Sequence, residues 1–244
     1  MADDPAPFGA LEPVGRARLL ARIRREFDIA EESLSFAGQT LRFTRVADPN
    51  AVLDEVCRQE TLREELGVQP RRALHMPYWA AVWESGVAIA DHMVGREGRA
   101  PIAGRRVLDL GCGLGLVGAV MAMLGAKATL ADIDTACLLF ARLNVLPWAA
   151  ASRVCRCDWR SDDLLEPFDL IVGADVLYET SQWPHIEAFA RRRLAPGGTL
   201  VLGEPGRPQA RGFPAWLADR GWRMEACEAG VADKHVHIYE AQPD

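Results

Sequence analysis

Residues 107–118 read VLDLGCGLGLVG. In this stretch a short apolar run meets four glycines (Gly111, Gly113, Gly115 and Gly118), and a helical pattern follows. Glycines at such a junction let the backbone turn sharply and approach a ligand without a Cβ clash. The first turn of the following helix then offers free N–H groups to an anionic group. The segment therefore predicts a strand, a ligand-binding loop and a helix, which together open an α/β fold.

The rest of the chain repeats this alternation. Further strand-like segments lie at 128–131, 153–157, 169–175 and 199–204, with helical patterns between them. Strands that alternate with crossover helices are typical of a parallel sheet covered by helices on both faces. The last two strand-like segments, 223–229 and 235–241, have little between them and are expected to pair as an antiparallel hairpin. The prediction is a doubly wound, mostly parallel, seven-stranded α/β sheet of the Rossmann-like type.

The first 75 residues follow a different pattern. A helix is expected over residues 14–28, a β-hairpin over 34–36 and 41–46 around Ala37, Gly38 and Gln39, and a second helix over 51–66. Residues 68–76 are expected to form a connection. We therefore divide the chain into an N-terminal extension, residues 1–75, and an α/β domain, residues 76–244.

Composition excludes several classes of protein. A formal net charge of -6 argues against a broad nucleic-acid surface, which needs clustered positive charge. No apolar run approaches the roughly 20 residues that span a bilayer, so no membrane contact is expected. The first ten residues resemble neither a signal nor a transit peptide. The six cysteines form no CxxC pair, which predicts reduced thiols, no metal site and a cytoplasmic location.

The glycine loop suits two classes of cofactor, because Gly113-x-Gly115-x-x-Gly118 also satisfies the dinucleotide fingerprint. Asp109, just before the loop, suits a ligand that carries an ammonium group and would repel a pyrophosphate. Asp132, at the end of the next strand, is placed to bond both hydroxyls of a ribose. NAD and S-adenosylmethionine share that ribose, so Asp132 supports both cofactors equally.

Further polar residues stand at the ends of the third and fourth strands. Asp158 is expected to bind the cofactor by accepting a hydrogen bond from its adenine amino group, and the alternative is that it caps the following turn. Trp159 could cover a ring. The fourth strand ends in Asp175-Val176-Leu177-Tyr178, and in a doubly wound sheet this end lies beside the ligand crevice. Asp175 and Tyr178 are therefore expected to face both cofactor and substrate.

Together these segments resemble the seven-β-strand (class I) S-adenosylmethionine-dependent methyltransferases. The shared marks are Asp-x-Gly-x-Gly-x-Gly, an acid after the second strand, and Pro-Gly-Gly before the fifth. A narrower resemblance is to the lysine methyltransferase family with an Asp-x-x-Tyr motif. It is carried by PYWAAVWESG at 77–86 and GADVLY at 173–178. The segment GEPGR at 203–207 is similar to the branch that modifies the β subunit of electron-transfer flavoprotein, which has Asp in place of Glu204.

The resemblance implies an enzyme that uses S-adenosyl-L-methionine, and it makes residues 76–244 the methyltransferase domain. It implies cofactor contacts from Trp83, the loop Gly111 to Gly115, Asp132, Trp159 and Ala174. The motif places Asp175 and Tyr178 at the catalytic site, where Asp175 would accept from and orient the incoming amine and Tyr178 would align its lone pair.

The acceptor is expected to be a lysine of a protein substrate. A small amine or a nicotinamide-like pyridine is the alternative, because the family also contains nicotinamide N-methyltransferases. An NAD-binding oxidoreductase, or a cofactor-binding protein without turnover, is a third possibility, which Asp109 and the Asp-Val-Leu-Tyr strand end disfavour.

Overall fold

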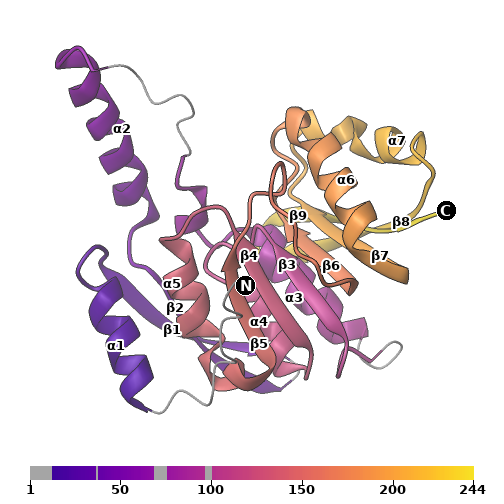
Figure 1. Cartoon of the computed structure of the whole chain (residues 1–244), viewed down its shortest axis with the longest axis horizontal. Coiled ribbons are helices and arrows are strands. Elements are labelled where there is room, and N and C mark those ends of the chain that lie inside the picture. Colours follow the sequence, from indigo (N-terminus) through magenta and orange to yellow (C-terminus); the bar gives the residue numbers. More distant parts are fainter. Residues whose placement is uncertain (1–12, 37, 69–75, 97–100) are drawn as a thin grey trace, which may run out of the picture.

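The computed structural model describes residues 13–36, 38–68, 76–96 and 101–244. Its main element is a seven-stranded sheet with the order β5-β4-β3-β6-β7-β9-β8 (Figure 1). The first five strands in this order are parallel, and β9 runs antiparallel to both β7 and β8, which confirms the predicted sheet and its terminal hairpin. The strands are β3 (Arg106–Leu110), β4 (Lys127–Asp132), β5 (Ser152–Arg156), β6 (Phe168–Ala174), β7 (Leu194–Glu204), β8 (Trp222–Val231) and β9 (Lys234–Pro243).

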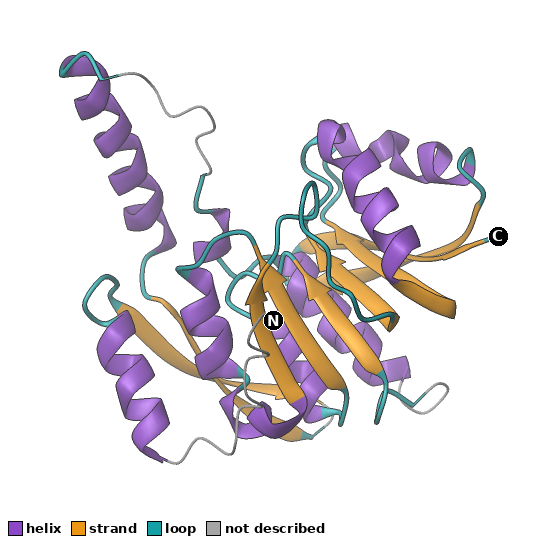
Figure 2. Ribbon diagram, in the orientation of Figure 1, coloured by secondary structure: helices purple, strands orange, loops and turns teal. Residues whose placement is uncertain are grey.

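Helices cover both faces of this sheet (Figure 2). One face packs against α3 (Glu84–Arg96), α4 (Leu116–Met123) and α5 (Cys137–Asn144), and the other packs against α6 (Trp183–Arg193) and α7 (Phe213–Ala218). Neighbouring strand residues alternate between the two cores. Val107 joins the first core and Leu108 the second, because successive side chains of a strand point to opposite faces. Short 3-10 helices lie at η1 (Tyr78–Ala80), η2 (Leu146–Ala151), η3 (Thr180–Gln182) and η4 (Pro208–Gly212).

The Pro-Gly-Gly segment lies inside β7 and interrupts its pairing with β6. Phe168 pairs with Leu194, but Leu170 already pairs with Thr199, so β7 accommodates three extra residues at this point. Gly197 has a φ of 75°, a left-handed conformation that glycine adopts without a steric penalty. Regular pairing between β6 and β7, which continues to the carboxyl end of the sheet, therefore begins at Leu170 and Thr199.

The N-terminal extension contains α1 (Pro13–Ile23), β1 (Ile29–Phe36), β2 (Gln39–Val46) and α2 (Pro49–Glu65), in the predicted order. The helix expected to reach residue 28 ends at Ile23. Hydrogen-bonded turns continue the chain to Phe27, whose N–H donates to the Ile23 carbonyl at 3.0 Å and whose ring packs edge-on against Trp79, with ring centroids 5.5 Å apart. Three sequence-based statements, on Ala37 of the hairpin turn, on residues 69–75 of the connection and on residues 1–10, lie outside the described residues.

The extension shares its apolar core with the larger sheet. Ile23 and Phe43 are fully buried in the same cluster as Phe140 of α5 and Val107 of β3. The division at residue 75 therefore separates two sequence patterns rather than two separate cores.

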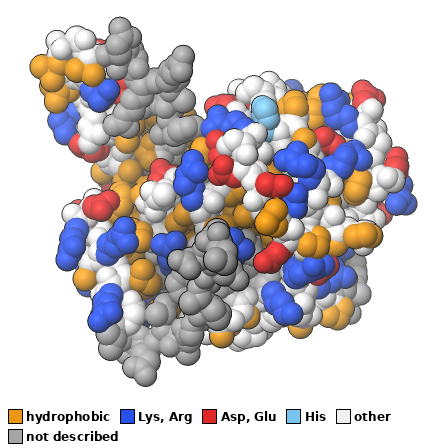
Figure 3. Space-filling view, in the orientation of Figure 1, with side chains coloured by type: hydrophobic (Ala, Val, Ile, Leu, Met, Phe, Trp, Pro, Cys, Tyr) orange, Lys and Arg blue, Asp and Glu red, His pale blue; other side chains and the backbone are white. Residues whose placement is uncertain are grey.

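Helix α2 adds no fully buried side chain to this core, although Val52 packs against it. It stands out from the body of the molecule in Figures 1 and 3, and none of its side chains is fully buried. Its capping residue Asp48 accepts hydrogen bonds from the N–H groups of Asn50 and Ala51, which fixes where the helix begins. Leu62, near its far end, is 46% exposed. None of the helices in the described ranges combines the length and the apolar character that crossing a bilayer requires.

Candidate functional site

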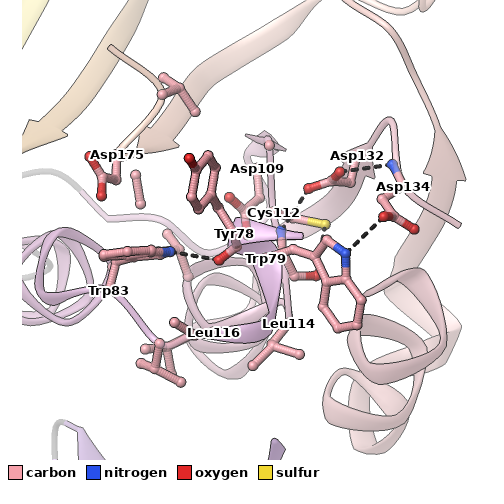
Figure 4. A pocket seen from close by; sticks show the side chains of 18 of the residues that line it. Tyr78, Trp79, Trp83, Asp109, Cys112, Leu114, Leu116, Asp132, Asp134 and Asp175 are labelled. Atoms are coloured by element: carbon pink, nitrogen blue, oxygen red, sulfur yellow. Dashed lines mark hydrogen bonds between the residues drawn. The ribbon is translucent and has the colours of Figure 1, made fainter. Parts of the chain in front are cut away.

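A pocket opens at the carboxyl ends of β3, β4 and β6 (Figure 4). The sheet order reverses between β3 and β6, and ligands of doubly wound folds bind at such a switch point. Residues of η1 and the start of α3 form the opposite wall. Every residue predicted for the site lines this pocket except Gly115 and Asp158: the lining includes Trp83, Asp109, Gly111, Gly113, Asp132, Trp159, Ala174, Asp175 and Tyr178.

The glycine loop takes the backbone close to its surroundings. Gly111 has a φ of 72°, and a Cβ on it would lie 2.9 Å from Cγ1 of Val176 and 3.4 Å from the ring of Trp159. Gly115 has a φ of 83° and serves a different purpose, because a Cβ there would lie 2.9 Å from Cα of Ala141 in α5. The missing side chain of Gly111 therefore leaves room beside Val176 and Trp159 in the pocket, whereas that of Gly115 allows close packing between the loop and α5.

Asp132 ends β4 with its carboxylate among backbone N–H groups of the pocket wall. Its Oδ2 accepts from the N–H of Gly113 at 2.9 Å and its Oδ1 accepts from the N–H of Asp134 at 3.0 Å. Burial raises its pKa, and these hydrogen bonds oppose the shift. Each carboxylate oxygen keeps a further lone pair, so the residue holds the loop and retains acceptor capacity toward the pocket.

Asp109 lies beneath the loop, with Oδ2 2.7 Å from the N–H of Gly118 in the first turn of α4. Burial raises the pKa of this carboxyl to about 7, opposed by the Gly118 bond and assisted by the charge of Asp132. Asp109 is therefore a group that changes its charge in the neutral range.

Two tryptophans of the opposite wall are held by hydrogen bonds that Figure 4 shows. The Trp79 Nε1–H donates to Oδ2 of Asp134 at 2.8 Å, and the Trp83 Nε1–H donates to the carbonyl of Tyr78 at 2.8 Å. The ring of Trp79 lies near the Asp132 end of the pocket and that of Trp83 near the Asp175 end. These hydrogen bonds thus fix the orientation of one indole ring at each end of this wall.

Asp158 and Trp159, neighbours in sequence, have different surroundings. Both carboxylate oxygens of Asp158 bond to the Arg160 guanidinium, at 2.8 and 2.7 Å, and Oδ1 also accepts from the Arg160 N–H at 3.0 Å. This geometry favours the turn-capping alternative over an adenine contact. The indole N–H of Trp159 donates to Oε1 of Gln182 at 3.1 Å, and the ring lies over Gly111 in the pocket.

Asp175 and Tyr178 stand at the end of β6. Asp175 has a φ of 55°, in the left-handed region that Asp and Asn enter more readily than most residues. Its N–H donates to the carbonyl of Gly203 at 2.9 Å. The Tyr178 ring contacts that of Tyr78 edge-on, with centroids 5.8 Å apart, and burial raises the pKa of its hydroxyl. Tyr178 therefore stays protonated at neutral pH.

Sequence reasoning gave no role to Arg207, although it quoted the GEPGR segment that contains it. The Arg207 guanidinium makes a two-point ion pair with the Asp175 carboxylate. The sequence likewise suggested no role for Tyr78, Trp79 and Asp134, which line the pocket. The signal for the two aromatic residues was their place in the PYWAAVWESG segment, whereas the Asp134 contact depends on a partner 55 residues away.

Similar proteins of known structure support the fold. A ribosomal protein L11 methylase from Lactobacillus delbrueckii subsp. bulgaricus matches with a TM-score of 0.55 at 19% identity, covering 67% of this chain and 81% of that one. The glycopeptide N-methyltransferase MtfA matches with a TM-score of 0.54 at 16% identity, covering 65% of this chain and 90% of that one.

Relatives in sequence are more specific. The EEF1A lysine methyltransferase 3 of Mus musculus is 28% identical over 73% of this chain and 78% of its own length. Protein N-lysine methyltransferase METTL21A of Danio rerio is 36% identical, over 50% of this chain and 58% of its own length. The electron transfer flavoprotein beta subunit lysine methyltransferase of Xenopus laevis is 33% identical, over 57% and 56%. The chain thus spans less than two thirds of the last two relatives.

The pattern of the lysine methyltransferase family matches residues 77–209, more than half of the chain. The matched range runs from η1 to the loop that carries Arg207, and it includes every residue that lines the pocket except Phe43 and Met76. The chain belongs to the lysine methyltransferase family and is an S-adenosylmethionine-dependent methyltransferase.

Proposed function

We propose that this enzyme transfers a methyl group to the side-chain amine of lysine in a protein substrate. The observation that carries the proposal is that one pocket joins the glycine loop and Asp132 to the strand end with Asp175 and Tyr178. The first set suits a cofactor and the second suits an amine. The names of the sequence relatives, which are protein lysine methyltransferases, point to the same acceptor.

The residues present fit S-adenosylmethionine at the loop end of the pocket. Asp132 retains acceptor capacity for the ribose hydroxyls, Gly111 and Gly113 leave the floor open, and the Trp159 ring offers an apolar surface. Asp109 would favour the ammonium of the cofactor once ionised. When bound, the cofactor supplies an electrophilic methyl group on a sulfonium.

At the other end the chain must provide a neutral amine. A lysine with a pKa of about 10.4 is mostly protonated at pH 7, and deprotonating it costs about 4–5 kcal/mol, at about 1.36 kcal/mol for each pH unit. The apolar surroundings of Tyr78, Trp83 and Tyr178 lower that cost by desolvation. Asp175 would accept a hydrogen bond from the amine and aim its lone pair along the line of transfer.

The residues at the mouth of the pocket are consistent with a protein as the methyl acceptor. Tyr78 is 44% exposed and Tyr178 is 36% exposed, and their rings contact each other at the rim. Exposed aromatic side chains of this kind are common where one protein binds another. A lysine side chain would enter between such residues while the rest of its protein stays outside.

The proposal extends to organisation and location. Residues 76–244 would form the catalytic domain, and residues 1–75 an extension that shares its core. All six cysteines are free, which supports a reducing, cytoplasmic environment.

Incubation with labelled S-adenosylmethionine tests the acceptor. Soluble cell extract is treated with the enzyme, with the Asp132→Ala variant as the matched control, and labelled proteins are digested for mass spectrometry. The expected result is label on a lysine of a discrete protein, present only with the unmodified enzyme. Label confined to small molecules would instead identify a small amine as the acceptor.

A further inference from the structure

Arg207 grips the carboxylate of Asp175 through a planar, two-point contact. Its Nε lies 3.0 Å from Oδ1 and its Nη2 lies 2.5 Å from Oδ2. The Asp175 side chain is 5% exposed, whereas that of Arg207 is 34% exposed. Both oxygens of the carboxylate that we place beside the acceptor amine are therefore already bonded to a cation.

Hydrogen bonds in the turn after β7 hold Arg207 in position. Glu204, buried at the end of β7, accepts the N–H of Gly206 at 2.8 Å and the N–H of Arg207 at 2.5 Å. This bonding fixes the turn that presents the guanidinium. The Arg207 Cζ also lies 5.6 Å from the centre of the Trp83 ring, at cation–π distance. The contact is thus built from residues that follow β6 and β7 and from Trp83, which directly precedes α3.

Other charged and titratable groups face the pair. Glu204 and Glu84 attract Arg207, and Lys234 of β9 is ion-paired with Glu84 on the α3 side. Tyr178 stands on the Asp175 side, with Glu179 next to it in sequence. The hydrogen bonds that Arg207 donates to Asp175 raise the pKa of Arg207, burial opposes this, and the charges of Asp175 and of these carboxylates add to the increase, so the guanidinium keeps its charge at any working pH. Arg207 and Asp175 together carry no net charge.

We propose that Arg207 is a positioning residue that both orients Asp175 and cancels its charge, so that the incoming amine is favoured in its neutral, nucleophilic form. The inference rests on the proposed function. A carboxylate without a partner would hold a lysine as an ammonium ion, because an opposite charge within about 4–6 Å stabilises the charged form by roughly 1–3 pKa units. The paired carboxylate keeps a lone pair for orienting the amine and loses most of this stabilising effect.

The pH dependence of single-turnover methylation tests the proposal. The probe is the protein band that the unmodified enzyme labels in soluble extract, at saturating labelled S-adenosylmethionine, between pH 6 and 10. Arg207→Gln removes the charge, and it should move the midpoint of the rising limb upward by about one pH unit. Its rate should fall about tenfold at pH 7 and recover toward the unmodified rate at high pH. Tyr178 does not interfere, because burial raises the pKa of its hydroxyl.

Three further variants separate charge from structure. Arg207→Lys keeps the charge but not the two-point grip, so it should slow the reaction without moving the midpoint. Adding Asp175→Asn to Arg207→Gln should return the midpoint toward that of the unmodified enzyme. Arg211→Gln, an exposed arginine four residues along the chain, should change neither rate nor midpoint. Calorimetry with S-adenosylhomocysteine checks that each variant still binds cofactor.

A loss of rate in Arg207→Gln that is the same at every pH would show a purely structural role and overturn the proposal. An unchanged rate and midpoint would overturn it as well. If the unmodified enzyme labels no protein at all, the proposed function fails first, and that result is distinct from a failure confined to Arg207.

Discussion

The side-chain amide of Asn144 bonds both backbone polar groups of Thr44, a hundred residues earlier in the chain. The Thr44 N–H donates to Oδ1 at 2.8 Å, and Nδ2 donates to the Thr44 carbonyl at 2.9 Å and to the Leu114 carbonyl at 2.9 Å. All three hydrogen bonds are buried. One side chain therefore ties β2 of the extension, α5 and the glycine loop together.

Asn144→Ala should lower the free energy of unfolding by at least about 2 kcal/mol, because a buried polar group without a partner costs about 1–3 kcal/mol. Urea unfolding followed by circular dichroism measures this. Asn50→Ala, at an exposed position of α2, is the matched control and should have little effect. Equal stability of the two variants would contradict a structural role for Asn144 in joining the extension to the core.

Asp175→Asn and Tyr178→Phe should reduce turnover by at least about tenfold, the size expected when a group that orients or accepts is lost. Asn also tolerates the left-handed backbone at position 175, so the fold should be retained. The measurement is single-turnover methylation alongside calorimetry with S-adenosylhomocysteine. Turnover close to that of the unmodified enzyme in both variants would remove these residues from the mechanism.

Asp132→Ala should weaken the binding of S-adenosylhomocysteine by at least about tenfold, since a hydrogen bond to a charged group contributes about 1.5–3 kcal/mol. Asp158→Ala is its counterpart, because this carboxylate is bonded to Arg160 and does not line the pocket. That variant should bind within about twofold of the unmodified enzyme. A large loss of affinity in Asp158→Ala would restore the adenine contact considered from the sequence.

Asp109 should make cofactor binding depend on pH. Burial raises the pKa of this carboxyl to about 7, so it is mainly protonated at pH 6 and mainly ionised at pH 8. The ionised form attracts the cofactor ammonium, and affinity for S-adenosylhomocysteine should rise over this range by up to roughly tenfold. Isothermal calorimetry at several pH values, with Asp109→Asn for comparison, isolates this group from the titration of the ligand amine.

The same residue affects stability with the opposite sign. Between about pH 4 and pH 7 the folded protein holds the Asp109 proton that the unfolded chain has released, so this group makes the fold less stable as pH rises. The free energy of unfolding of Asp109→Asn relative to the unmodified protein should therefore increase across that window. A constant difference would mean that Asp109 is not protonated in the folded state.

The sheet could be predicted from the sequence because strands and turns are indicated by residues that lie close together along the chain. The short apolar run before Gly111 predicted β3, and the glycines marked the turn into α4. Asp132 and Asp175 were placed by the same reasoning, because a residue at the carboxyl end of a parallel strand reaches the crevice whatever its neighbours.

The remaining features depend on partners that no local pattern specifies. Two roles for Asp158 were open until Arg160 was seen to bond both of its oxygens. Gly115 belongs to the loop motif, yet its neighbour is Ala141 of another helix. The partner of Asp175 stands 32 residues further along the chain, at a position set by the turn after β7.

Helix α2 has a consequence for local unfolding. None of its side chains is fully buried, although Val52 packs against the core, so opening this helix exposes little of the core. Its amide hydrogens should therefore exchange with deuterium far faster than those of β3. Helix α2 contacts η1, the element that carries Tyr78 on the pocket rim. Slower exchange in α2 on addition of an acceptor protein would make this helix a built-in reporter of substrate engagement.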